Sequence, residues 1–120
     1  SSSFKDVLDI FQTRKKEFDS ANACTSVSSC ARRCKEIGSS VAYHACLSDP
    51  RWSDLLEFIG TQVRVLSPRN LTMTAWGLAT LKAHQPLLAK RLAWQTVQKL
   101  DLFDARTLAN IIWAFATLDV

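Results

Sequence analysis

The chain has 120 residues, 48% of them apolar and 22% charged, which excludes a disordered protein and allows one domain with a hydrophobic core. Only three Gly and three Pro occur, too few for an all-β fold with many tight turns, so we expect an all-helical protein. The net charge of +4 is compatible with an anionic partner without requiring one. No apolar stretch is long enough for a transmembrane helix, so we expect no membrane insertion.

Apolar residues recur at helical spacing, and capping or turn residues separate the helical segments. The stretch Asp19–Asn22 offers N-cap chemistry, and Gly38 offers a C-terminal stop. Ser67 before Pro68 is typical of an N-cap followed by proline at the first helical position, and Asp104 takes an N-cap position later in the chain. These signals predict helices, in chain order, at about 4–18, 23–36, 39–46, 52–65, 68–83, 87–99 and 104–118.

One segment of the chain occurs twice. The sequence of Leu71–Leu81 returns 37 residues later as Leu108–Leu118, with Trp five positions after the first Leu and a final Ala-Thr-Leu in both copies. The preceding helices align at the same offset, since Leu55 falls on Leu92. A repeat of this length indicates stacked helical hairpins rather than a domain built around one catalytic pocket.

We therefore expect a single all-α domain, an α-solenoid of about three helical hairpins with repeats of about 37–38 residues. The first hairpin aligns with the second when Asn22 is placed on Asn70, an offset of 48, because an insert separates them. The expected domain covers 1–120, with repeat 1 at about 4–36, an insert at 37–49, repeat 2 at about 50–83 and repeat 3 at about 86–119.

The repeated second helix resembles the octotricopeptide (OPR) repeat of algal, dinoflagellate and apicomplexan proteins. The resemblance rests on Asn70-Leu-Thr-Met-Thr-Ala-Trp-Gly-Leu-Ala-Thr-Leu81 and Thr107-Leu-Ala-Asn-Ile-Ile-Trp-Ala-Phe-Ala-Thr-Leu118, while the first unit lacks the Trp. It implies an RNA-binding α-solenoid of mitochondria or chloroplasts, acting in the processing, stability or translation of mRNA or on ribosomal RNA. Some of these proteins carry a C-terminal RAP domain, which this sequence lacks, so its nuclease activity is not implied.

Several arginines are candidates for binding RNA phosphates. Arg69 and Arg106 hold equivalent positions near the start of the repeated second helix, where two guanidinium groups can track successive phosphates. Two basic runs of the first hairpin would extend such a track if they faced the same groove; the alternative is that all these side chains are solvated. The candidates are Arg14, Arg32, Arg33, Arg69 and Arg106.

Base contacts are expected from polar or small side chains on the open face of the second helices. Trp76 and Trp113 offer stacking surfaces, but their fixed place in an apolar helix favours packing between adjacent hairpins. The base-contact candidates are Asn70, Met73 and Thr74 in repeat 2, and Thr107 and Asn110 in repeat 3.

We expect neither an enzyme nor a metal or cofactor. The four cysteines are interpreted as reduced thiols that pack as small apolar residues in a reducing compartment. Cys30, Cys34, Cys46 and His44 lack the spacing of zinc knuckles. No Gly-rich phosphate loop, nucleophile motif or convincing carboxylate pair occurs, so no catalytic residue is predicted.

The leading hypothesis is an RNA-binding helical-repeat protein of an organelle, acting on transcripts or associated with the ribosome. The alternative is a non-catalytic scaffold or accessory subunit that binds protein partners in a large organellar complex, since a solenoid surface serves both. Convergence of the arginines on one open groove would favour RNA. Their scattering, together with an exposed apolar face near Trp113, would favour a protein partner.

Overall fold

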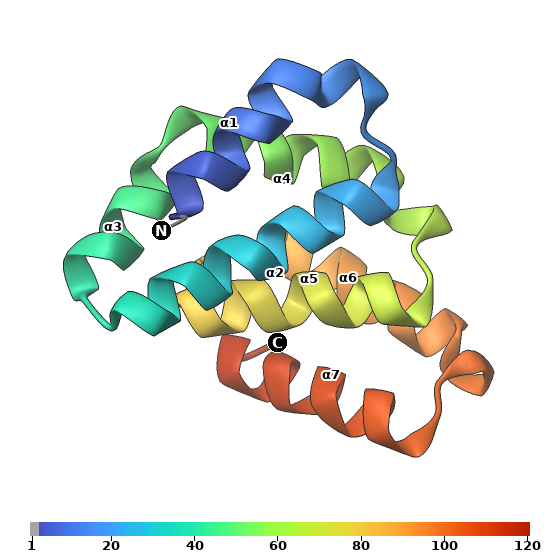
Figure 1. The fold of residues 1–120 in the computed structure, drawn as a ribbon. Coiled ribbons are helices and arrows are strands. Elements are labelled where there is room, and N and C mark those ends of the chain that lie inside the picture. The colour runs from blue at the N-terminus through green and yellow to red at the C-terminus, as the bar shows by residue number, and fades with distance from the viewer. Residues whose placement is uncertain (1–2) are drawn as a thin grey trace.

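The computed structural model describes residues 3–120; residues 1 and 2, which the expected domain includes, lie outside the described part. The described residues form helices joined by short turns, with no β-strand among them, so the prediction of an all-helical protein is confirmed (Figure 1). The elements are α1 (Phe4–Arg14), η1 (Lys15–Glu17), α2 (Ser20–Ile37), α3 (Ser40–Ser48), α4 (Pro50–Gln62), η2 (Val63–Val65), α5 (Pro68–Leu81), α6 (Pro86–Gln98), η3 (Leu100–Leu102) and α7 (Ala105–Leu118).

The same turn joins α1 to α2, α4 to α5 and α6 to α7. In each case the first helix ends in a 3-10 turn, an apolar residue follows in extended conformation, and an N-cap residue begins the second helix. The apolar residues are Phe18, Leu66 and Phe103, and each donates its N–H to the carbonyl three residues earlier. The N-cap residues are Asp19, Ser67 and Asp104, and each side chain accepts from the N–H three residues later. Such a cap supplies a partner to one of the free N–H groups at a helix start.

The second helices also end alike. Gly38 terminates α2 in the left-handed conformation with φ 70°, as its position in the sequence predicts. Lys82 and Asp119 hold the same conformation at the ends of α5 and α7, with φ of 55° and 60°. The two residues lie 37 positions apart, so the sequence offset recurs in backbone geometry. A non-glycine residue at such φ values is strained by its Cβ atom.

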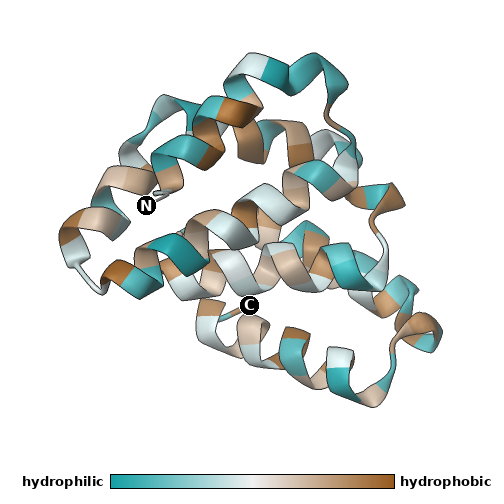
Figure 2. Cartoon of the chain, viewed as in Figure 1, coloured by the Kyte–Doolittle hydropathy of each residue, from teal (hydrophilic) through white to brown (hydrophobic). Residues whose placement is uncertain are grey.

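The three second helices lie side by side in the order α2, α5, α7 (Figure 1). Helices α1 and α4 pack against α2, while α6 packs against α5 and α7. The helices carry both apolar and polar positions (Figure 2), and buried apolar residues of neighbouring helices form one core. Helices α2 and α5 approach closely, since a Cβ atom added to Gly77 would lie 2.6 Å from Cγ1 of Val27.

Polar links between neighbouring hairpins accompany this packing. Lys99, at the end of α6, donates to the carbonyl oxygens of Arg64 and Leu66, each at 2.8 Å. Arg91 of α6 donates to the carbonyl oxygen of Gly60 at 2.7 Å. These bonds satisfy carbonyl groups where α4 and η2 end, because a helix terminus leaves its last carbonyls without intrahelical partners.

The predicted insert at 37–49 contains a helix of its own. α3 packs against α2 and α4, and its Cys46 is fully buried. Asp49 ends this segment and caps α4, accepting from the N–H of Arg51 at 2.9 Å. The guanidinium of Arg51 pairs with Asp49 and also reaches Asp9 on α1. No helix within residues 3–120 combines the length and apolar character needed to cross a bilayer.

Candidate nucleic-acid interface

An open groove of about 650 Å³ crosses the row of second helices. This volume falls in the range of small-molecule and cofactor sites, about 300–1,000 Å³. All three hairpins contribute to it, which places residues far apart in the sequence on one surface. Its lining consists of Ser28, Arg32, Lys35 and Glu36 from α2, Arg69, Thr72, Met73 and Trp76 from α5, and Asn110 from α7.

Three cations border the groove. Arg32, Lys35 and Arg69 are exposed, and Arg32 makes a long hydrogen bond of 3.5 Å from Nη2 to the hydroxyl of Ser29. None of the three forms an ion pair within residues 3–120. Glu36 adds one carboxylate to the lining, so the local charge is positive without being uniform. Unpaired guanidinium groups can bind the oxygens of a phosphate in bidentate geometry.

Part of the groove lining is suited to contact with a planar ring. Met73 and Trp76 lie one turn apart on α5 and are both half-buried. Asn110 is exposed on α7 and provides an amide with both donor and acceptor atoms. Aromatic and thioether groups pack on the face of a base, while an amide pairs with its edge.

The structure brings together only some of the predicted phosphate-binding residues. Arg32 and Arg69, from different hairpins, meet at the groove. Arg14 lies outside the lining and is paired with Glu17, which holds the pKa of the guanidinium above its usual value. Arg33 is half-buried, and its buried Nε has no hydrogen-bond partner among the described residues. Arg106 is exposed one turn before Asn110 and also lies outside the lining.

The predicted base-contact residues divide in the same way. Met73 and Asn110 line the groove. Thr74 is fully buried and therefore cannot contact a base. Its hydroxyl donates to the carbonyl of Asn70 at 2.9 Å. Asn70 and Thr107 are half-buried at the starts of α5 and α7, where their N–H groups donate to the N-cap side chains. Neither lies in the lining of the groove.

The repeated tryptophans differ from one another. Trp76 packs against the core with part of its surface and lines the groove with the rest. Trp113, its equivalent 37 residues later, is 49% exposed, although the sequence favours packing between hairpins for both. The reason is spatial: α5 lies between α2 and α7, whereas α7 has a neighbouring second helix on one side only within the described residues.

The four cysteines are free thiols, and each of them is fully buried, in agreement with their predicted role as small apolar residues. Burial raises the pKa of Cys24 to about 11 and that of Cys34 to about 12. The neighbouring Cys30 thiol, together with burial, raises the pKa of Cys46. Thiols with raised pKa values stay protonated at neutral pH and are poor nucleophiles.

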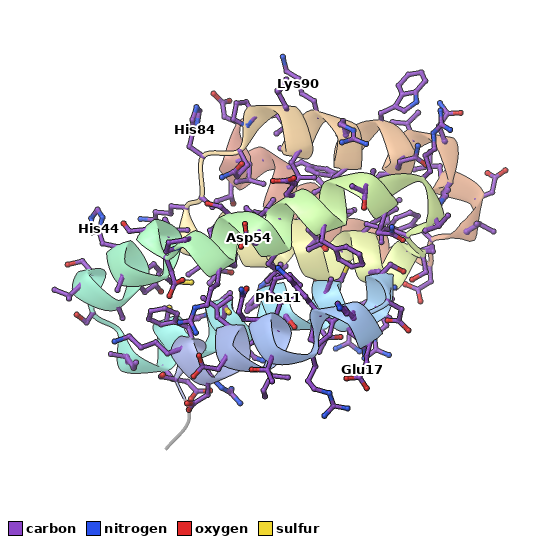
Figure 3. The ribbon with its side chains drawn as sticks, turned by 90° about the horizontal axis from the view of Figure 1, so that it is seen from above. Phe11, Glu17, His44, Asp54, His84 and Lys90 are labelled. Atoms are coloured by element: carbon purple, nitrogen blue, oxygen red, sulfur yellow. The ribbon has the colours of Figure 1, made fainter. Side chains whose placement is uncertain are left out.

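The two histidines do not join any functional cluster. His44 on α3 and His84 between α5 and α6 extend outward at separate places on the surface (Figure 3). Among residues 3–120, no three His, Cys, Asp or Glu side chains are grouped so that they could hold a metal ion.

Three lining residues, Ser28, Glu36 and Thr72, are not among the predicted site residues, and Lys35 is predicted only as part of a basic run of the first hairpin. A signal for Lys35 exists in the sequence, because Ser28, Arg32 and Lys35 follow the i, i+4, i+7 spacing of one helix face.

No family model, no curated protein and no solved structure matches this chain.

Proposed function

We propose that this chain is a small helical-repeat module that binds single-stranded RNA in the groove across α2, α5 and α7. In this proposal the three hairpins are successive turns of an α-solenoid, and the row of second helices is its binding surface. The OPR resemblance of the two repeated helices points to the same function, in a mitochondrion or chloroplast. The observation that carries the proposal is the meeting of unpaired Arg32 and Arg69 beside Met73 and Trp76.

The groove suggests a division of roles among its residues. Arg32, Lys35 and Arg69 bind phosphate oxygens, since their charges are free of carboxylate partners within the described chain. One base packs against Met73 and the exposed part of Trp76, a contact that tolerates any base. A single strand fits such a site better than a duplex, because unstacked bases can turn toward the protein.

The test is fluorescence anisotropy with a labelled single-stranded oligouridine as a function of salt concentration. Each phosphate contact with a single strand contributes about −0.7 to the slope of the logarithm of the association constant against the logarithm of the salt concentration. Three contacts therefore predict a slope of about −2. Arg32→Gln and Arg69→Gln should each weaken binding and reduce the steepness of that slope by about 0.7. Arg14→Gln is the control, because Arg14 is exposed, carries the same charge, lies outside the lining and is paired with Glu17.

Two outcomes would contradict the proposal. One is the absence of binding at low salt by a folded sample. The other is that Arg14→Gln weakens binding as much as Arg69→Gln, which would mean diffuse attraction to a basic protein rather than recognition in the groove. A duplex RNA of the same length, included as competitor, separates single-strand binding from attraction to phosphate alone.

A second candidate function is that of a non-catalytic scaffold in a larger complex. It is favoured by the exposed apolar side chains of the last hairpin, including Trp113 and Ile112. Exposed apolar patches of this kind are typical of protein–protein contacts. If the RNA titration fails while the protein is folded, this candidate takes precedence.

A further inference from the structure

The outer face of α7 is apolar and uncovered. Between Leu108 and Ala116 the only polar residue is Asn110. The inner face packs toward α5 through the fully buried Ile111 and Ala114. On the opposite face, Ile112 is 57% exposed and Trp113 is 49% exposed. A helix that is apolar on all sides is normally buried on all sides.

The equivalent face of α5 shows what such a surface contacts. Thirty-seven residues before Ile112 and Ala116 lie Ala75 and Ala79, which are both buried. They belong to a helix that has second helices on both sides. The outer face of α7 therefore holds the same repeat positions as a face of α5 that is buried between helices. No helix within the described residues covers this face of α7.

Equivalence in the repeat register adds two residues of the preceding elements to this surface. Val97 at the end of α6 is 61% exposed, and Leu100 in η3 is 48% exposed. Their equivalents in the preceding hairpin are Gly60, which receives a hydrogen bond from Arg91 of the next hairpin, and the buried Val63. We call the surface formed by Val97, Leu100, Ala109, Ile112, Trp113 and Ala116 the end face.

The residues along α7 are arranged symmetrically about the centre of the end face. Ile112 and Trp113 occupy the centre, and Ala109 and Ala116 lie three positions outward on either side. Arg106 lies six positions before Ile112, and Asp119 lies six positions after Trp113. Both side chains are exposed, and they are opposite in charge. In a contact between two identical surfaces related by a two-fold axis, each position meets its mirror position in the other copy.

Two antiparallel α7 helices would therefore match one another. Ile112 would pack on the partner's Trp113, and the small Ala109 would lie opposite the partner's Ala116, which lets the helix axes approach closely. Arg106 would pair with the partner's Asp119 at both ends of the contact. Antiparallel helices also place opposite ends of their macrodipoles side by side.

We propose that the end face is the interface between two copies of this chain, formed by a two-fold, antiparallel contact between their α7 helices. The apolar centre excludes water, and the two Arg106–Asp119 pairs fix the register. None of the end-face residues lines the groove, so the proposed interface and the groove are formed by different residues.

Sedimentation equilibrium from micromolar to hundreds of micromolar protein tests the proposal. The expected result is a reversible shift from the 13.4 kDa of one chain toward twice that mass. Ile112→Asp should weaken association at least tenfold. Leu87→Asp is the control, because Leu87 is even more exposed but lines a groove between α4 and α6. Circular dichroism of each variant verifies that it is folded.

A charge exchange tests the register. Arg106→Glu alone and Asp119→Lys alone should each weaken association, because like charges would then face each other at both ends. Mixing the two variants should restore it, since the carboxylate introduced in one chain would face the ammonium group introduced in the other. Lysine is acceptable at position 119 because Lys82 holds the same left-handed conformation at the equivalent position. The proposal would be overturned by a monomeric wild type, by a dimer that Ile112→Asp does not weaken, or by a mixture of the two charge variants that fails to associate. It would also be overturned if another protein were found to bind the end face.

Discussion

The helices α5 and α7 carry the same motif but lie in different surroundings. Both begin with a side-chain cap, carry Trp at the same position and end at a left-handed residue. Leu71, Leu78 and Leu81 of α5 are fully buried, while the equivalent residues of α7 are half-buried. The difference follows from neighbours, because α5 lies between α2 and α7. The sequence of a repeat determines the helix, and its place in the row determines how much of the helix is covered.

The largest difference between the two helices is expected from truncating the first leucine of the motif. Leu71→Ala should destabilise the protein by about 3 kcal/mol, because the removed atoms leave a cavity in a fully packed site. Leu108→Ala should have a smaller effect of about 1–2 kcal/mol, since Leu108 is half-buried. Urea unfolding followed by circular dichroism measures both. Equal effects would mean that α7 is covered as fully as α5 in solution.

A smaller effect is expected at the tight contact between α2 and α5. Gly77→Ala should destabilise by about 1–2 kcal/mol, because overpacking against Val27 exceeds the gain in helix propensity. At the equivalent position of α7, Ala114→Gly should destabilise too, by about 1 kcal/mol, since α7 keeps a buried methyl group there. Thermal unfolding of the two variants measures this contrast. A stabilising Gly77→Ala would show that α2 moves away easily.

Replacing the strained helix ends should stabilise the protein. Lys82→Gly should add about 0.5–1 kcal/mol, because glycine adopts the left-handed conformation without a Cβ clash. Asp119→Gly should add less, since Asp tolerates this conformation better than Lys and since the end of α7 is less covered. Chemical denaturation ranks the two. A loss of stability in Lys82→Gly would indicate that its side chain makes contacts that outweigh the strain.

The smallest contrast concerns the caps and depends on pH. The N–H of Thr107 holds the pKa of Asp104 below its ordinary value, whereas α5 has the non-ionising Ser67 at the same position. A lowered folded-state pKa stabilises the protein above the unfolded value of about 3.9, and this contribution is lost as pH falls below it. Wild type should therefore be more stable than Asp104→Ser at neutral pH, and the gap should shrink between about pH 4 and pH 2. Denaturant titrations of both proteins across this pH range measure the difference in their free energies of unfolding. A difference that stays constant with pH would contradict an electrostatic contribution from the cap.

Much of the fold could be predicted because its signals are local. Ser67-Pro68, Asp104 and Gly38 act within one helical turn, and the structure uses each of them as a cap or stop. The turn residues Phe18, Leu66 and Phe103 are missing from the sequence prediction, although they precede each N-cap at a fixed position. The links from Lys99 and Arg91 to backbone carbonyls could not be predicted, because they depend on how neighbouring hairpins are placed.

The candidate site was predictable in part for the same reason. Arg69 and Arg106 hold the same position in α5 and α7, as the repeat predicts. The repeat cannot predict that Arg69 lines the groove and Arg106 does not, because this depends on the neighbouring helices. Helical periodicity places Thr74 near Met73 without revealing that Thr74 is fully buried, with its hydroxyl donating to the carbonyl of Asn70. Residues that share a helix therefore differ in role, while Arg32 and Asn110, 78 positions apart, share one surface.

The four tryptophans provide a set of built-in optical reporters. Trp52 is buried in the core, Trp76 lines the groove, Trp113 lies on the end face, and Trp94 is exposed elsewhere on α6. Indole emission shifts to shorter wavelength when water is removed from around the ring. Four single-tryptophan proteins, each with Phe at the other three positions, would thus report separately on unfolding from Trp52, on ligand entry from Trp76 and on self-association from Trp113, with the Trp94 protein as the solvent-exposed reference.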